Sequence, residues 1–154
     1  MQGTALRRKV GLPVSAIILL AALAALRVVP HDLGIVSEGS VVAWLLVFVP
    51  LTMWLTVVLR WQVPNPLLTL VVIGVAYGVM LAVGHQLLWE AAWDGSPPSL
   101  GGNLEGVLAP GLEAALFRTS AFLSSIVTGT LVGAAVGVVA WAIERVRRKQ
   151  RSTR

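Results

Sequence analysis

Four stretches of this chain are apolar over about 20 consecutive residues, the length of helix that crosses the hydrocarbon core of a bilayer. They cover residues 10–29, 40–59, 66–89 and 119–143. Lipid offers no hydrogen-bonding partner to an open backbone, and continuous apolar runs of this length are typical of membrane helices. The pattern therefore predicts an all-α, polytopic membrane protein, with one domain built as a bundle of four transmembrane helices.

Composition excludes several other classes of protein. Of the 154 residues, 56% are hydrophobic and only 12% are charged, about half the charged share of a soluble domain. The chain has no Cys, which excludes disulfides, thiolate metal sites and thiol catalysis. The net charge of +5 comes from basic residues that flank the apolar runs, so we expect no nucleic-acid partner.

The distribution of Lys and Arg predicts the orientation in the membrane. Three basic residues precede the first span, Arg60 follows the second, and six lie in the tail 144–154. The two remaining connections hold six acidic residues against Arg118 alone. Because Lys and Arg accumulate on the cytoplasmic side, we expect both termini in the cytoplasm of a bacterial cell and a multi-pass protein in its plasma membrane. The basic tail should attract anionic lipid at about 1 kcal/mol per charge.

The connection over residues 90–117 is the longest. Its first half is rich in Gly, Ser, Pro and Asn, which is typical of irregular turns. Its second half places apolar residues around Glu105 and Glu113, a pattern that predicts a short amphipathic helix in the membrane interface. The alternative is that the fourth helix begins early, at Leu112.

Small side chains recur every fourth residue in the last two spans. We call these two rows the small-residue ladders. They consist of Gly74, Gly78 and Ala82 in the third span, and of Ala121, Ser125, Gly129, Gly133 and Gly137 in the fourth. Small residues at this spacing let two helix backbones approach closely in lipid. We expect the two ladders to pack on each other within one chain; packing on a second copy or on another subunit is the alternative.

Once the orientation is set, several polar residues fall near the outer membrane face. They are Arg27, His31, His85, Gln86, Glu90 and Arg118. Ionisable residues within a span are costly and point to function by default. The simpler interpretations are that Arg27 extends outward to pair with Asp32 or Glu38, and that His85 is a hydrogen-bonded packing residue. No metal-ligand spacing surrounds the two histidines, so we expect no metal and no cofactor; haem held by His85 and His31 is a weaker alternative.

No motif identifies a substrate or a reaction. The midspan hydroxyls have no base at their depth, so we do not expect an enzyme. The leading hypothesis is a non-enzymatic accessory or structural subunit that acts through close helix packing, alone, as a homo-oligomer or in a larger membrane complex. The alternative is a small homo-oligomeric transporter or channel, with an outer vestibule lined by Arg27, His85 and Gln86 that favours an anionic solute. A third hypothesis is a haem- or quinone-binding protein that uses His85.

Overall fold

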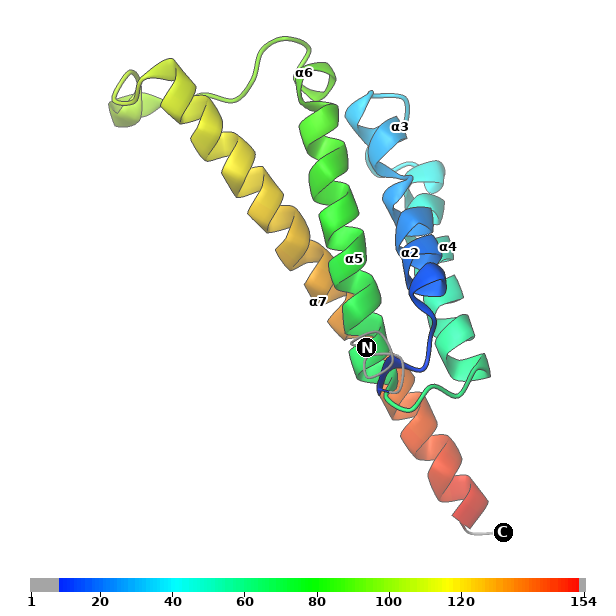
Figure 1. Ribbon diagram of the computed structural model, residues 1–154. Helices are drawn as coiled ribbons and strands as arrows, with labels where there is room; N and C mark the ends of the chain where they lie inside the picture. The colour runs from blue at the N-terminus through cyan, green and yellow to red at the C-terminus, as the bar shows by residue number, and fades with distance from the viewer. Residues whose placement is uncertain (1–8, 153–154) are drawn as a thin grey trace.

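The structure is a computed structural model in which residues 9–152 are described. Arg7, Arg8 and Arg154, which enter the orientation argument, lie outside that range. Every regular element of the described residues is helical (Figure 1). In chain order these are α2 (Val14–Ala25), α3 (Val28–Asp32), α4 (Val41–Arg60), α5 (Pro66–Leu87), α6 (Trp89–Ala92), the 3-10 turn η1 (Gly102–Leu104) and α7 (Pro110–Ser152).

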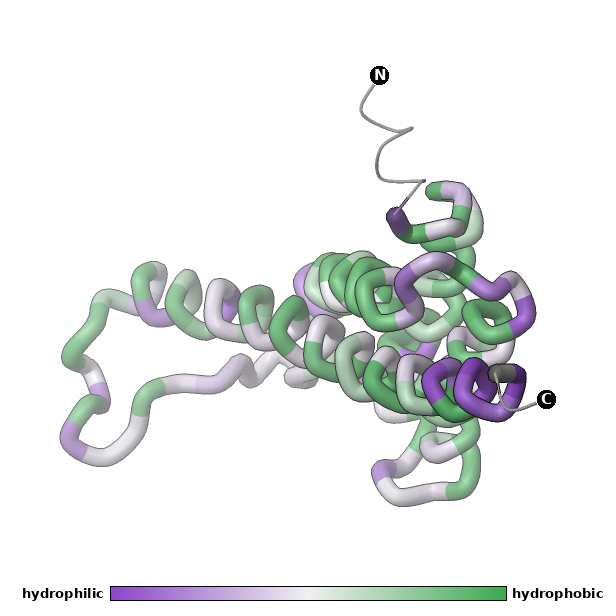
Figure 2. Tube along the Cα trace, turned by 90° about the horizontal axis from the view of Figure 1, so that it is seen from below, coloured by the Kyte–Doolittle hydropathy of each residue, from purple (hydrophilic) through white to green (hydrophobic). Residues whose placement is uncertain are grey.

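Four helical stretches of the described chain are long and apolar enough to cross a membrane: 14–32, α4, α5 and α7. This confirms the predicted all-α fold with four candidate membrane helices. These helices consist largely of hydrophobic residues, and hydrophilic residues gather in the connections and at the end of α7 (Figure 2). Many of the large hydrophobic side chains are exposed. An apolar exterior is what a bilayer requires of its helices, because lipid takes the place of water around them.

The first span is interrupted near its C-terminal end. Helix α2 ends at Ala25, and α3 begins again at Val28. The helical stretch therefore reaches Asp32, three residues beyond the predicted end at residue 29. Pro30 lies inside α3, and the chain turns back after it through hydrogen bonds from the backbone N–H groups of Ile35 and Val36 to the Pro30 carbonyl. This short helix places Asp32 on the inner side of the bundle, where it is buried.

Trp54 holds α4 to the rest of the bundle. Its side chain is fully buried, and its Nε1–H donates to the Leu20 carbonyl in α2 at 2.8 Å. Its ring also meets Tyr77 of α5 edge-on, with the ring centroids 5.6 Å apart. One side chain thereby joins three helices, in the packing that buried aromatic residues with a polar group favour. Pro50, one turn earlier, is also buried inside α4.

The two small-residue ladders face each other in the interface between α5 and α7. A Cβ atom added to Gly129 would lie 2.5 Å from the Gly74 oxygen and from the Cα and N of Gly78. A Cβ atom added to Gly133 would lie 2.9 Å from the Gly74 Cα. Ser125 completes the row, since its carbonyl oxygen would be 2.8 Å from a Cβ atom on Gly78. In the described chain this close packing, which we call the glycine interface, is formed within one protein molecule.

Helix α7 is much longer than a membrane crossing requires. Its 43 residues correspond to roughly 64 Å, about twice the thickness of the hydrocarbon core. It begins at Pro110 and runs without interruption into the span, which matches the alternative of an early start for the fourth helix. Between residues 95 and 109 the regular structure is limited to η1. Beyond the glycine interface, α7 diverges from α5, so its first turns stand apart from the other helices (Figures 1 and 2).

Candidate functional site

A cavity of about 600 Å³ lies at the end of the molecule where α7 diverges from α5. Residues of α3, α5, α6 and α7 line it, among them His31, Asp32, His85, Trp89, Ser124 and Ser125. Its volume falls in the range of small-molecule sites, which is about 300–1,000 Å³. The cavity exists because the glycine interface holds α7 against α5 only below it.

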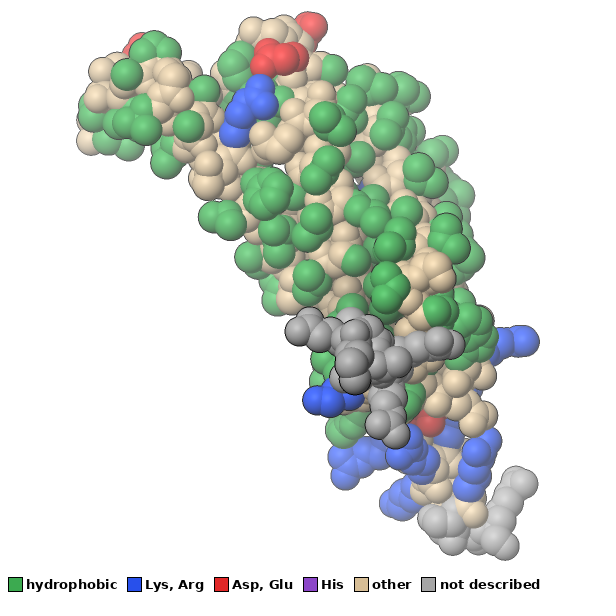
Figure 3. Space-filling model, in the orientation of Figure 1, with side chains coloured by type: hydrophobic (Ala, Val, Ile, Leu, Met, Phe, Trp, Pro, Cys, Tyr) green, Lys and Arg blue, Asp and Glu red, His purple; other side chains and the backbone are tan. Residues whose placement is uncertain are grey.

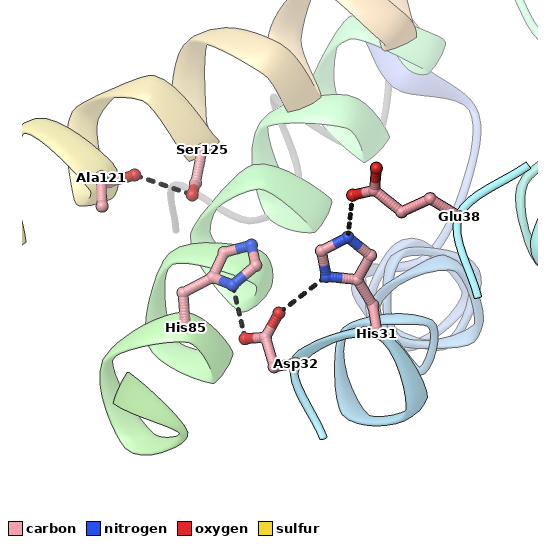
Figure 4. Close-up of polar contacts among 6 residues, drawn as sticks. All are labelled: His31, Asp32, Glu38, His85, Ala121 and Ser125. Carbon is pink, nitrogen blue, oxygen red and sulfur yellow. Dashed lines mark hydrogen bonds and ion pairs between the residues drawn. The ribbon is translucent and has the colours of Figure 1, made fainter. Parts of the chain in front are cut away.

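Asp32 is the centre of the polar residues in this cavity. Its side chain is only 3% exposed, and its two oxygens face two different imidazoles. His31 Nδ1 lies 2.9 Å from Oδ1, and His85 Nδ1 lies 2.6 Å from Oδ2 (Figure 4). A buried carboxylate is costly unless it is hydrogen-bonded, and two N–H donors satisfy one acceptor position on each oxygen. The burial of Asp32 therefore depends on both histidines.

These contacts determine which ring nitrogen of His85 is available. When Nδ1–H donates to a carboxylate, the neutral ring keeps its lone pair on Nε2, which can then accept a hydrogen bond or a proton. His85 Nε2 points away from Asp32 in Figure 4, and His85 is one of the cavity-lining residues. The other imidazole has a second partner, because His31 Nε2 lies 3.4 Å from Glu38 Oε1. Glu38, His31, Asp32 and His85 thus form a continuous chain of contacts.

The wall opposite His85 comes from the first residues of the α7 ladder, Ala121 and Ser125. The Ser125 hydroxyl donates to the Ala121 carbonyl at 2.8 Å (Figure 4), which uses its hydrogen and leaves its oxygen able to accept. Ser124 lines the same wall and is exposed. The indole side chains of Trp89 and Trp93 add apolar surface. The cavity therefore combines a few polar groups with an apolar lining, as small-molecule sites generally do.

Three of the predicted outer-face residues form a separate group that joins α5 and α6 to α7. Arg118 Nη2 lies 2.9 Å from Glu90 Oε1, and the Arg118 guanidinium stacks over the Trp89 ring with its Cζ atom 5.0 Å from the centroid. Gln86 Nε2 donates to the Arg118 carbonyl at 3.0 Å. These groups satisfy one another, and none of Gln86, Glu90 and Arg118 lines the cavity.

Arg27 does not line the cavity but belongs to a pocket that shares His31 with it. It lines a smaller pocket of about 220 Å³ with His31, Glu38 and Trp44, and it hydrogen-bonds to Tyr77. Among the described residues, Asp32 pairs with the two histidines and Glu38 pairs with His31. The ion pair expected from the sequence between Arg27 and one of these acids is therefore not formed.

The sequence placed Asp32 in a loop as an acid available to Arg27, and it gave no sign that Asp32 holds both histidines. The only local signal is its position directly after His31. The direction of its side chain depends on the short α3 helix, which an apolar run ending in Pro and His does not specify.

The alternative of haem held by His85 and His31 stays a prediction. Both Nδ1 atoms face Asp32, which leaves the two Nε2 atoms as possible ligands. His31 Nε2 lies 3.4 Å from Glu38 Oε1, so axial ligation by both histidines would require that contact to break. In the described part of the chain no group of three or more His, Cys, Asp and Glu side chains is arranged to hold a metal ion.

No protein-family model, no curated protein and no solved structure matches the chain.

Proposed function

We propose that the chain is a multi-pass protein of a bacterial plasma membrane with both termini in the cytoplasm, so that the cavity opens to the outside. The support is the distribution of charge. In Figure 3 most of the Lys and Arg side chains lie toward the free end of α7, whereas the end with the cavity carries Asp and Glu beside one basic group. Basic residues accumulate on the cytoplasmic side of membrane proteins.

The function we propose is binding of a small weak acid in the cavity, as the recognition step of a small transporter or channel. The observation that carries this proposal is the 2.6 Å contact between His85 Nδ1 and the buried Asp32. A carboxylate partner at Nδ1 fixes the tautomer in which Nε2 carries the lone pair. A solute HA that enters the cavity would transfer its proton to His85 Nε2, and the anion A⁻ would stay beside the imidazolium that forms.

The surroundings suit such an ion pair. Ser124 on the opposite wall offers a hydroxyl to the bound anion, and Trp89 and Trp93 reduce the water around it. Electrostatic attraction is stronger where water is excluded. This proposal keeps the preference for an anionic solute expected from the sequence, but it assigns the positive charge to a protonated His85 and not to Arg27.

Transport requires a second conformation in which a route through the protein is open. Directly below the cavity, the Gly78 backbone lies against Ser125 and Ile126 so closely that an added Cβ atom would be within 3.0 Å of both residues. This contact closes the route toward the cytoplasmic end. A solute could continue only if α7 separated from α5 at this point, or along an interface between copies of a homo-oligomer.

The hypothesis of a non-enzymatic accessory or structural subunit stays a prediction. It was motivated by close helix packing and by sparse chemistry inside the spans, and in the described chain the two ladders pack on each other, as the sequence predicts. A role as an accessory subunit would have to use another surface of the molecule.

The test is binding of lactate and benzoate to the purified full chain in detergent, followed by isothermal titration, together with lactate uptake into proteoliposomes. His85→Asn is the informative variant, because the Asn amide nitrogen can replace the Nδ1 donor to Asp32 while Nε2 is lost. We expect His85→Asn to weaken binding by about tenfold or more, the scale of one lost charge-assisted hydrogen bond.

Gln86→Ala is the matched control, since Gln86 neighbours His85 on α5 but bonds to Arg118 outside the cavity. We expect this control to bind both acids as the wild type does. Wild-type affinity in His85→Asn, or no binding of either acid to the wild type, would refute the proposal.

A further inference from the structure

A second pocket, of about 310 Å³, lies at the opposite end of the bundle from the cavity. One wall is the turn that joins α4 to α5, formed by Pro64, Asn65 and Pro66, and the other is the inner part of α7, with Trp141, Arg145 and Arg148. The weak-acid proposal makes no use of these residues.

The pocket lies between a conformationally restricted turn and a tightly packed part of α7. Asn65 caps α5, its Oδ1 accepting a hydrogen bond from the Leu68 N–H at 3.0 Å, and a proline on each side restricts the turn. On the facing helix, Gly137 is the last residue of the α7 ladder, and a Cβ atom added there would lie 3.1 Å from the Leu67 Cα. One turn further along, the bulky Trp141 faces the turn instead. The pocket therefore begins where the glycine interface ends.

Two guanidinium groups give the pocket its charge. Arg145 stacks over the Trp141 ring, with its Cζ atom 5.2 Å from the centroid, and this contact holds the guanidinium beside the pocket. Arg148 follows at three residues' distance, on the same side of α7. The single acid in the lining is Glu144, which lies 3.8 Å from both Arg147 and Arg148, too far for a hydrogen bond. The lining thus carries a net positive charge.

We infer that this pocket binds the phosphate headgroup of an anionic phospholipid of the inner leaflet. Guanidinium groups bind phosphate oxygens with two parallel hydrogen bonds, and Trp is typical of helices at the level of the headgroups. One turn deeper, α5 and α7 expose the apolar side chains of Leu67, Val138 and Val139. Charged groups beside an exposed apolar surface fit a lipid, whose acyl chains can lie along the helices, better than they fit a free phosphate ion.

Two particular arginines, Arg145 and Arg148, carry this binding, in contrast to a general attraction of the whole basic tail to acidic membranes. The tail supplies its own control. Arg145→Gln with Arg148→Gln removes both pocket charges, whereas Arg147→Gln with Arg151→Gln removes the same charge from residues outside the lining. Each pair also includes one of the two arginines near Glu144. All four side chains are exposed, so neither double variant should disturb the fold, which circular dichroism would verify.

The experiment is native mass spectrometry of the full chain in detergent, with phosphatidylglycerol titrated in and phosphatidylcholine as the neutral comparison. We expect wild type and the control pair to retain one tightly bound phosphatidylglycerol, and the pocket pair to bind it about tenfold more weakly, the scale of one lost charge-assisted hydrogen bond. Phosphatidylcholine should not be retained.

Three outcomes would overturn the inference. Equal weakening in both double variants would mean that the tail attracts lipid through its total charge alone. Equal retention of phosphatidylcholine would mean that the headgroup charge is not recognised. Displacement of phosphatidylglycerol by millimolar inorganic phosphate would make the pocket a site for the free ion. These results do not depend on whether the outer cavity binds a weak acid.

Discussion

Replacing Gly129 by Ala tests the glycine interface with the smallest change available. The added methyl group would lie 2.5 Å from three backbone atoms of α5: the Gly74 oxygen and the N and Cα of Gly78. Ordinary contacts of a Cβ atom start at 3.4 Å, so α7 would have to move away by about 1 Å. Backbone atoms cannot rotate aside as a flexible side chain does, and the neighbouring contacts of the ladder must therefore open too.

The magnitude follows from two opposing effects. Gly to Ala in a helix interior stabilises the helix by about 1 kcal/mol. Overpacking of a tight contact costs about 1–3 kcal/mol, and a gap of 0.5–1 Å removes about a quarter to a half of the dispersion energy of each contact along the row. Because all three close atoms belong to the backbone, we take the upper end of these values. The net loss of stability is then about 2 kcal/mol.

Gly111→Ala is the matched control, because Gly111 lies in the same helix and nothing is within 4 Å of the added methyl group. Both variants would be unfolded reversibly in mixed micelles by titration with a denaturing detergent, with helicity as the signal. We expect Gly129→Ala to unfold earlier than wild type and Gly111→Ala to unfold with it or later. If Gly129→Ala were as stable as Gly111→Ala, α5 and α7 could not approach each other as described.

Three further changes address single contacts. Asp32→Asn should destabilise the fold by about 1–3 kcal/mol, because the amide offers one acceptor oxygen to two imidazole N–H groups in a buried site. The same detergent titration measures this loss of stability. Unchanged stability would mean that the histidines do not depend on the carboxylate. Trp54→Phe keeps the buried ring but loses the hydrogen bond to the Leu20 carbonyl, which should cost about 1 kcal/mol; a wild-type midpoint would count against that contact. Thr69→Val removes the hydroxyl that donates a hydrogen bond to the Val10 carbonyl at 2.7 Å. The segment before α2 should therefore exchange its amide hydrogens faster, as measured by hydrogen-exchange mass spectrometry. Thr69→Ser keeps the hydroxyl and should leave the exchange rate unchanged.

The helices of this fold follow from its sequence to a large extent. Apolar runs of sufficient length predict four membrane helices because lipid permits few other backbone structures. The pair Pro64 and Pro66 marks the turn between α4 and α5, since proline cannot continue the first helix and suits the first turn of the second. The packing of the α5 ladder on the α7 ladder could be predicted, because glycines at every fourth residue are typical of helices whose backbones approach closely.

The candidate site could be predicted only in part. His31 and His85 were both assigned to the outer face, and the structure brings them together, but through Asp32, whose role depends on the direction of one side chain in a five-residue helix. Gln86, Glu90 and Arg118 were assigned to the same level, and they form their own group. The depth of a residue in the membrane follows from its position along a span. The direction in which its side chain points from the helix axis depends on how the helices pack.

The crossing of α5 and α7 also defines a point about which α7 could tilt relative to α5. Gly129 and Gly133 lie at the middle of α7, a helix of 43 residues, so roughly 30 Å of helix extends on either side. If α7 tilts as a rigid rod about this point, its two ends move in opposite directions, by roughly 2–3 Å for a tilt of about 5° over that length. Such a tilt would change the width of the cavity beside His85 and the position of Arg145 and Arg148 together. For a rigid α7, any change at one end of this protein would therefore be accompanied by an opposite displacement at the other end.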